Sequence, residues 1–272
     1  MADMTAIEFV AASSQYLTCG DEPDYNSPYS WSAWVWFQAH ATNSFVFEIA
    51  ANTSNYDVVR FDAAETLRLY SRHTGSNEIA STGSTSGLSG WHHLAGVRGG
   101  TGDQDLSLYL DGVLECSGTN TSAMTDRTAA ARFSLGRSYQ GPTSYGNERH
   151  ADWKFWTEEL TAAEILLEAE QGAPVRASNL WGAWSLADLR DDSGNGRDFT
   201  ATGSPVAADG PGVPHDLGSL LLVSVEAASG AGVTGTGASV GLVGTGAGVG
   251  APTATGTGAS VGLVGTGAGV GA

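Results

Sequence analysis

The stretch DLSLYLDGVLEC, residues 105–116, limits the possible folds of this chain more than any other segment. Its leucines recur at every second position, so they fall on one face of an extended strand. Asp111 and Gly112 then supply the pair of positive φ angles that a type I′ turn requires. The segment is therefore predicted to be a β-hairpin, the clearest local prediction in the sequence.

The same kind of pattern recurs from about residue 5 to about residue 157, as short apolar alternations separated by clusters of Gly, Ser, Asn and Asp. In the segment SWSAWVWF both alternating sets are largely apolar, which is typical of a central strand in a sandwich. Many short strands with few helices indicate an all-β fold of two packed sheets. Four tryptophans are predicted to lie in its core: Trp34, Trp36, Trp153 and Trp156.

One helix is predicted, in the segment LTAAEILLEAEQG. Thr161 is placed to cap its N-terminus, and Glu164 three residues later completes a capping box. Ile165, Leu166 and Leu167 are predicted to form its buried stripe. We expect this helix to pack across the edge of the sandwich and to close the domain.

The charge of the chain is strongly uneven. The formal net charge is -17, and no charged residue follows Glu226, so all of this charge belongs to the first part of the chain. Such an acidic surface disfavours nucleic acids and anionic membranes as partners. No apolar run reaches the length of a membrane span, and no secretory signal follows Met1, so we expect synthesis in the cytoplasm or export without such a signal. Cys19 and Cys116 are predicted to be two small buried thiols rather than a single bridge.

Taken in their order along the chain, these segments resemble the laminin-G-like jelly roll of the concanavalin A-like lectin/glucanase superfamily. The resemblance covers about 165 residues and implies two antiparallel sheets with a concave face. The segments that carry it are AIEFVAASSQYLTC, YSWSAWVWF, WHHLAGVR, LSLYLDGVLECSG, FSLGRS and ADWKFWTEELTAAEI.

One segment stands in an unusual place. The pattern W-x-L followed by D-x-S-G-N-G often opens the family's domain, but here it follows the helix, at residues 184–199. We expect this segment to fold back onto the sandwich rather than to begin a second module. The predicted organisation is a jelly roll over residues 1–204 with fold-back strands in 172–204, a linker over 205–226 and a repeat tail over 227–272.

The superfamily includes glycoside hydrolases, and retaining hydrolysis needs two carboxyl groups about 5–5.5 Å apart. Alternate positions on a strand would supply such a pair, but no E-x-D-x-x-E-like run is present. The chain is therefore predicted to be non-enzymatic. His92 and His93 are adjacent on a predicted strand and point to opposite faces, so they are predicted to be structural and not ligands of one metal ion.

The segment DDSGNGRD is similar to the first half of an EF-hand-type calcium loop. Asp191, Ser193 and Asn195 have the spacing of the first oxygen ligands of such a loop. Thr202 stands where the loop has its bidentate Glu, and Asp198 partly compensates for this difference. The turn is therefore a candidate Ca²⁺ site, and an Asx-rich turn between two strands is the alternative.

The polar loop SYQGPTSYGNERH contains the side chains best suited to bind a sugar. Tyr139 and Tyr145 offer rings on which a sugar can stack, and Arg149 offers hydrogen bonds. Long polar loops often carry recognition residues. An ordinary surface loop is the alternative.

The phrase TGTGASVGLVGTGAGVGA occurs twice near the end of the chain. Glycine at every second position allows extended strands to stack closely. One copy buries too little surface to fold alone, so we expect neighbouring copies of the chain to associate through it. A flexible linker is the alternative. The apolar positions predicted to mediate assembly are Val240, Leu242, Val243 and Val249, repeated as Val261, Leu263, Val264 and Val270.

These features lead to one functional hypothesis and one alternative. A lectin-like jelly roll with no secretory signal and with a repetitive tail indicates a structural or adhesive protein of a bacteriophage virion, as a capsid decoration, a fibre or a tail component. Its expected partners are copies of itself, other virion proteins and glycans. The alternative is a bacterial surface or secreted glycan-binding module that is anchored by its tail.

Overall fold

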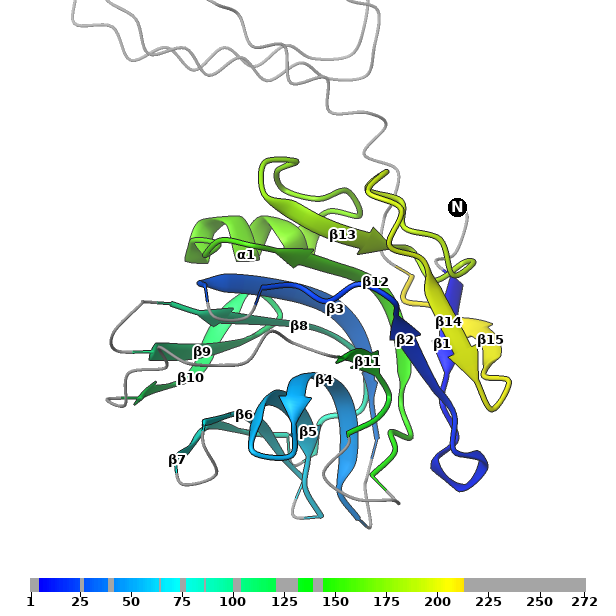
Figure 1. Cartoon of the computed structure of the whole chain (residues 1–272), viewed down its shortest axis with the longest axis horizontal. Helices are drawn as coiled ribbons and strands as arrows, with labels where there is room; N and C mark the ends of the chain where they lie inside the picture. The colour runs from blue at the N-terminus through cyan, green and yellow to red at the C-terminus, as the bar shows by residue number, and fades with distance from the viewer. Residues whose placement is uncertain are drawn as a thin grey trace, which may run out of the picture. The chain divides into compact units, whose positions relative to one another are not determined.

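The computed structural model describes residues 5–24, 27–38, 42–63, 65–73, 77–85, 87–99, 104–120, 132–138 and 144–212. Within these residues the chain forms two antiparallel β-sheets packed face to face, with a short α-helix on the outside of one sheet (Figure 1). The predicted jelly-roll sandwich with a single helix is confirmed for this part of the chain, but the helix packs on the outer face of one sheet and not across the edge of the sandwich.

Sheet A has the strand order β10-β9-β8-β3-β12-β1-β15, and β13 pairs with the part of β12 that β1 leaves free. The bounds of its strands are β1 Thr5–Glu8, β3 Tyr29–Phe37, β8 Gly90–Arg98, β9 Gln104–Leu110, β10 Val113–Asn120, β12 Arg149–Trp156, β13 Leu180–Trp184 and β15 Val206–Asp209.

Sheet B has the strand order β14-β2-β11-β4-β5-β6-β7. The bounds of its strands are β2 Tyr16–Cys19, β4 Ser44–Asn52, β5 Asn55–Phe61, β6 Thr66–His73, β7 Asn77–Ser84, β11 Arg132–Leu135 and β14 Phe199–Thr202. A short 3₁₀ turn, Ala11–Ser13, joins β1 to β2 and thereby connects the two sheets.

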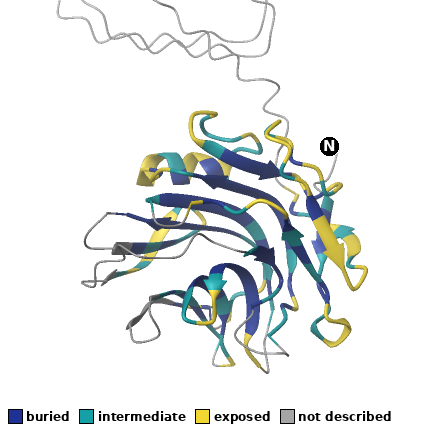
Figure 2. Ribbon diagram, in the orientation of Figure 1, coloured by how far each residue is buried: buried dark blue, intermediate teal, exposed yellow. Residues whose placement is uncertain are grey.

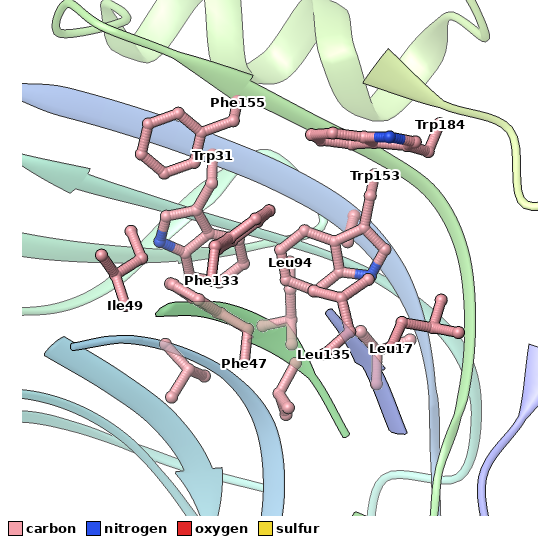
Figure 3. Close-up of a cluster of buried hydrophobic side chains, with 14 of the residues drawn as sticks. Leu17, Trp31, Phe47, Ile49, Leu94, Phe133, Leu135, Trp153, Phe155 and Trp184 are labelled. Atoms are coloured by element: carbon pink, nitrogen blue, oxygen red, sulfur yellow. The ribbon is translucent and has the colours of Figure 1, made fainter. Parts of the chain in front are cut away.

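The core between the sheets is rich in aromatic rings (Figure 3). Trp31 of β3 stacks on Trp153 of β12 with ring centroids 5.6 Å apart. Phe47 of β4 meets both rings edge-on, at 4.8 Å and 5.4 Å. All three side chains are fully buried, so Trp153 lies in the core as predicted.

The prediction for two of the other tryptophans is wrong. Trp34 and Trp36 are half-buried on the outer face of sheet A, which we define as the face turned away from sheet B. The register of β3 explains this, because Trp31, Val35 and the residues that alternate with them point into the core. Trp156 is buried as predicted, but beneath the helix and not between the sheets.

The hairpin predicted from residues 105–116 is present as β9 and β10. Asp111 has a φ of 49° and Gly112 a φ of 79°, as a type I′ turn requires. Gly112 is needed for a second reason, since a Cβ added there would lie 2.7 Å from Cδ1 of Leu166 on the helix. The hairpin turn therefore also provides a surface against which the helix packs.

The segment after the helix returns to the sandwich and adds a strand to each sheet. In sheet A β13 pairs with β12, and in sheet B β14 pairs with β2. The predicted linker over 205–226 is wrong at its start, because Val206–Asp209 forms β15 and pairs with all four residues of β1. The prolines and glycines of this stretch flank the strand and do not interrupt it. Residues 213–226 of the predicted linker and the tail over 227–272 lie outside the described residues.

Both cysteines are free thiols. Cys19 is buried and Cys116 is half-buried, and burial raises the pKa of each thiol to about 11. Among the described residues, no helix has the length and apolar character that crossing a membrane would require.

Candidate functional site

A buried group of charges lies on the outer face of sheet A, where β12 departs from regular pairing. The register between β12 and β3 shifts between Ala151 and Lys154. Asp152, inside this shift, has a φ of 52°, in the left-handed region that is strained for a residue with a side chain. Its carboxylate accepts a hydrogen bond from Nζ of Lys154 at 2.6 Å. The irregularity of the strand thus coincides with a close, buried ion pair.

A second carboxylate, from helix α1 (Ala162–Glu170), reaches the same lysine. Glu168 Oε2 lies 3.1 Å from Lys154 Nζ and accepts a hydrogen bond from the Ser32 hydroxyl at 3.3 Å. The backbone N–H of Val175 donates to the other oxygen of Glu168. Burial alone would lower the pKa of Lys154, but Asp152 and Glu168 outweigh it and raise that pKa. We call Asp152, Lys154 and Glu168 the buried triad.

The position of Glu168 is set by local signals in the sequence around the start of α1. The predicted capping box is present, since the Thr161 N–H donates to Glu164 Oε2 at 2.7 Å and the Glu164 N–H donates to Thr161 Oγ1 at 3.2 Å. The buried side of α1 consists of Ile165 and Glu168, three residues apart (Figure 2).

The predicted stripe of three consecutive apolar residues is therefore wrong beyond Ile165. Leu166 and Leu167 are 45% and 40% exposed, because neighbouring residues on a helix point about 100° apart.

A cavity of about 150 Å³ opens beside the triad, between β12, β13 and the turns that follow α1 and β13. We call it the β12–β13 cavity. Its walls are formed by Asp152, Lys154, Gly172, Pro174, Leu180, Ala183, Trp184, Ser185, Asp192 and Ser193.

His93 lies close to the triad. It is 1% exposed, and its ring meets that of Trp34 edge-on at 5.5 Å. Burial, helped by the positive charge of Lys154, lowers the pKa of His93 to about 3. Its neighbour His92 contacts Phe37 at 4.8 Å instead, so the two histidines lie against different surroundings.

The low pKa of His93 predicts a specific loss of stability in acid. The unfolded chain takes up a proton on this histidine below its ordinary pKa of 6.5, whereas the folded protein does so only near 3. As the pH falls from 6.5 toward 3, we expect His93 to lower the free energy of unfolding by about 1.4 kcal/mol per pH unit. Urea denaturation of the wild type and of His93→Gln from pH 7 to pH 4 measures the difference in slope. Parallel profiles for the two proteins would contradict the prediction.

A cluster of aromatic and charged side chains lies further along the same face of sheet A. Trp36 of β3 and Trp91 of β8 are half-buried cross-strand partners whose rings meet at 81° with centroids 5.8 Å apart. The guanidinium of Arg149 lies 5.4 Å from the ring of Trp36, and its Nε is 3.4 Å from Oε2 of Glu8. Four neighbouring strands thus each contribute one side chain. We call Glu8, Trp36, Trp91 and Arg149 the tryptophan corner.

The two predicted sugar-binding residues that the structure describes lie in different surroundings. Arg149 belongs to the tryptophan corner, whereas the ring of Tyr145 stacks beside that of Tyr16 in sheet B, 6.2 Å away. Arg137 lies over both of these tyrosine rings, at 4.4 Å from Tyr16 and 5.8 Å from Tyr145. Tyr139 lies outside the described residues, as do all of the positions predicted to mediate assembly.

In the predicted calcium turn, Asp191 accepts hydrogen bonds from the backbone of the turn. One oxygen accepts from the N–H groups of Ala183 and Ser193, at 3.1 Å and 3.0 Å, and the other from the N–H of Arg197 at 3.1 Å. Burial would raise the pKa of Asp191, but the hydrogen bonds from Ser193, Ala183 and Arg197 outweigh it and lower that pKa. This pattern is that of an Asx-braced turn.

The other three predicted ligands also have hydrogen-bond partners within the protein. The Ser193 hydroxyl oxygen accepts from the backbone N–H of Asn195 at 3.3 Å. The Asn195 amide donates to the carbonyl oxygens of Leu180 and Trp181, at 3.0 Å and 3.2 Å. Asp198 accepts from the backbone N–H of Asp191 at 2.9 Å. No group of three or more His, Cys, Asp or Glu side chains that could hold a metal is found in the described part of the chain. Calcium binding at this turn stays a prediction.

Sequence reasoning missed Lys154, although one signal points to it. Lys154 is the only lysine in the sequence, and it stands within the apolar strand segment ADWKFW. A lysine in such a strand is rarely buried unless it is paired, so its position implies carboxylate partners. The identity of those partners could not be read from the pattern, because Asp152 lies in an irregular stretch and Glu168 comes from another element.

Comparison with known proteins identifies the family. The sequence profile of the concanavalin A-like lectin/glucanase superfamily matches residues 11–166, so the chain belongs to that superfamily. Its fold is that of lectins and related carbohydrate-binding domains. No curated protein sequence matches the chain.

Solved structures share this fold at low sequence identity. A SAP-like pentraxin from Limulus polyphemus is 14% identical, with a TM-score of 0.53, over 76% of this chain and 95% of the pentraxin chain. A protein from Bacteroides ovatus described as carbohydrate-binding is also 14% identical, with a TM-score of 0.54, over 77% of this chain and 61% of that one. At this identity the likeness shows the fold alone.

Proposed function

We propose that this chain is a non-enzymatic carbohydrate-binding protein whose sugar site is the tryptophan corner. The observation that carries the proposal is the perpendicular pair of half-buried rings, Trp36 and Trp91, beside two charged side chains. The apolar C–H face of a sugar ring packs against an aromatic face, which carries partial negative charge. Arg149 and Glu8 are 36% and 37% exposed, so they can form charge-assisted hydrogen bonds with sugar hydroxyls.

The arrangement of carboxylates supports binding without hydrolysis. Asp152 and Glu168 lie close together on the outer side of sheet A, but both form ion pairs with Lys154, and Glu168 is fully buried. A retaining glycosidase needs both carboxyl groups to face the glycosidic bond. The buried triad therefore favours a structural role for this pair of carboxylates.

The proposal includes display on a larger assembly, with a bacteriophage virion as the setting. The duplicated uncharged tail supports this part, because it contrasts with the first 226 residues, which carry the whole charge of -17. A tail without charge is suited to burial between copies, whereas the acidic domain is suited to exposure in water.

The sugar site is tested by removing its rings. We expect Trp36→Ala and Trp91→Ala each to weaken binding to an immobilised panel of neutral glucose, galactose and mannose oligosaccharides by about tenfold or more, since about 1.4 kcal/mol corresponds to tenfold. Arg190→Ala is the surface control and should leave binding unchanged, because Arg190 is 82% exposed and lies outside the corner. Unchanged binding in both tryptophan variants would exclude the corner as the site.

The display part is tested by limited proteolysis of the native assembled particle. We expect residues after about 226 to be protected in the particle and to be cleaved rapidly in the dispersed chain. Rapid cleavage in both samples would show that the tail does not hold the assembly together.

A further inference from the structure

We infer that the β12–β13 cavity is a pocket for one neutral sugar ring, the end unit of the glycan whose next units lie on the tryptophan corner. This inference rests on the proposed function and names the part of the glycan that would be recognised. The volume of the cavity, about 150 Å³, is the size of an engineered cavity that admits benzene, and the cavity is open on one side. It therefore has room for one six-membered ring whose hydroxyl substituents project through the opening.

The walls of the cavity match the two kinds of surface on a sugar ring. Pro174, Leu180 and Ala183 provide apolar contacts for its C–H groups. Ser185 and Asp192 provide hydroxyl and carboxylate groups for its hydroxyls. Mostly apolar walls with a few placed polar groups are typical of small-molecule pockets.

The charges around the cavity select against acidic sugars. The single positive charge, on Lys154, already has two carboxylate partners, Asp152 at 2.6 Å and Glu168 at 3.1 Å. Asp192, on the cavity wall, adds a further carboxylate. On the cavity wall the two carboxylates of Asp152 and Asp192 thus outnumber the one ammonium group, so the cavity offers acceptors to hydroxyl groups and repels a ligand carboxylate.

The backbone at Asp152 supports a binding role. Asp152 is buried and holds a left-handed backbone conformation, which residues with side chains seldom adopt and which clusters at ligand sites. In this backbone conformation the carboxylate of Asp152 contacts Lys154, and both side chains line the cavity.

The cavity and the tryptophan corner lie along one strand. Arg149 of the corner and Asp152 of the cavity are three residues apart on β12, which corresponds to about 10 Å of extended chain. A short glycan can span this distance, with its end ring in the cavity and an inner ring against Trp36.

The unique lysine allows a direct test. Protein labelled only with [¹⁵N]lysine gives a single backbone amide signal, that of Lys154, because the sequence contains no other lysine. The probes are the methyl glycosides of glucose, galactose and mannose, with galacturonic acid as the acidic comparison. We expect at least one neutral glycoside to shift this signal in a saturable way and galacturonic acid to leave it unmoved.

A variant that closes the cavity completes the test. Ser185 lies on the exposed wall, so Ser185→Phe should fill the opening without disturbing the fold and weaken the saturable shift by tenfold or more. Ala187→Phe, at an exposed position outside the cavity wall, is the matched control and should leave the shift unchanged. Near-ultraviolet circular dichroism verifies that both variants are folded.

The outcomes separate this inference from the proposed function. Oligosaccharide binding that depends on Trp36 and Trp91 but never moves the Lys154 signal would overturn the pocket and leave the proposed function intact. An equal shift with galacturonic acid would overturn the selection by charge. Absence of binding by every neutral sugar would overturn both.

Discussion

Lys154→Met is expected to lower the free energy of unfolding by about 3–5 kcal/mol, the range for breaking a buried ion pair by removing one partner. The side chain of Lys154 is 2% exposed, and its removal leaves the carboxylates of Asp152 and Glu168 buried without an ammonium group. Because the folded-state pKa of Lys154 lies above its ordinary value of 10.5, this stabilisation is complete at neutral pH. It is lost only as the pH rises above 10.5.

A triple variant tests whether the loss of stability comes from the two unpaired carboxylates. Replacing the whole triad by Lys154→Met, Asp152→Asn and Glu168→Leu removes both stranded charges, and Asn tolerates the left-handed backbone at position 152. We expect this triple variant to regain most of the lost stability in urea denaturation at pH 7. A triple variant no more stable than Lys154→Met would show that packing, and not unpaired charge, is what the lysine provides.

Asp57→Asn is expected to be similarly destabilising, by about 3–5 kcal/mol, because it leaves the charge of Arg98 inside the sandwich. Asp57 of β5 and Arg98 of β8 are 0% and 1% exposed, and Nε of Arg98 lies 3.8 Å from Oδ2 of Asp57. The hydroxyl of Tyr29 donates to the same oxygen at 2.9 Å. This ion pair connects sheet B to sheet A through the interior.

Tyr29→Phe separates the hydrogen bond from the ion pair. It removes only the hydroxyl, so we expect a smaller loss of about 1.5–3 kcal/mol, typical of a hydrogen bond to a charged group. Both variants are measured by urea denaturation at pH 7 with the full chain. Equal losses in Asp57→Asn and Tyr29→Phe would contradict the assignment of the larger effect to the ion pair.

The parts of the fold that the sequence predicts well are those with local causes. The hairpin at Asp111 and Gly112 depends on two residues that accept positive φ, and the start of α1 depends on Thr161 and Glu164. Each of these signals acts within a few residues, so it can be read without knowing the rest of the chain. The family resemblance adds the order of the strands to these local signals.

The candidate site was only partly predictable. The polar loop indicates Arg149 as a sugar-binding residue, whereas the alternation around Trp36 favours a core position and nothing in the pattern marks Trp91 as a partner. The pattern SWSAWVWF is apolar on both faces, so it does not reveal which set of residues points inward. The register of β3 between β8 and β12 decides this, and that register depends on pairing between segments far apart in the chain.

By itself, therefore, the sequence determined the class of fold, the hairpin, the capped helix and the contrast between an acidic domain and an uncharged repeat tail. Only the tertiary structure decided that Lys154 meets Asp152 and Glu168, that a cavity opens beside them, and that Trp36 and Trp91 form a corner with Arg149. The physical reason is the distance along the chain over which each interaction acts. Turns and caps arise from neighbouring residues, whereas ion pairs and sites arise from packing between elements that the chain brings together only when it folds.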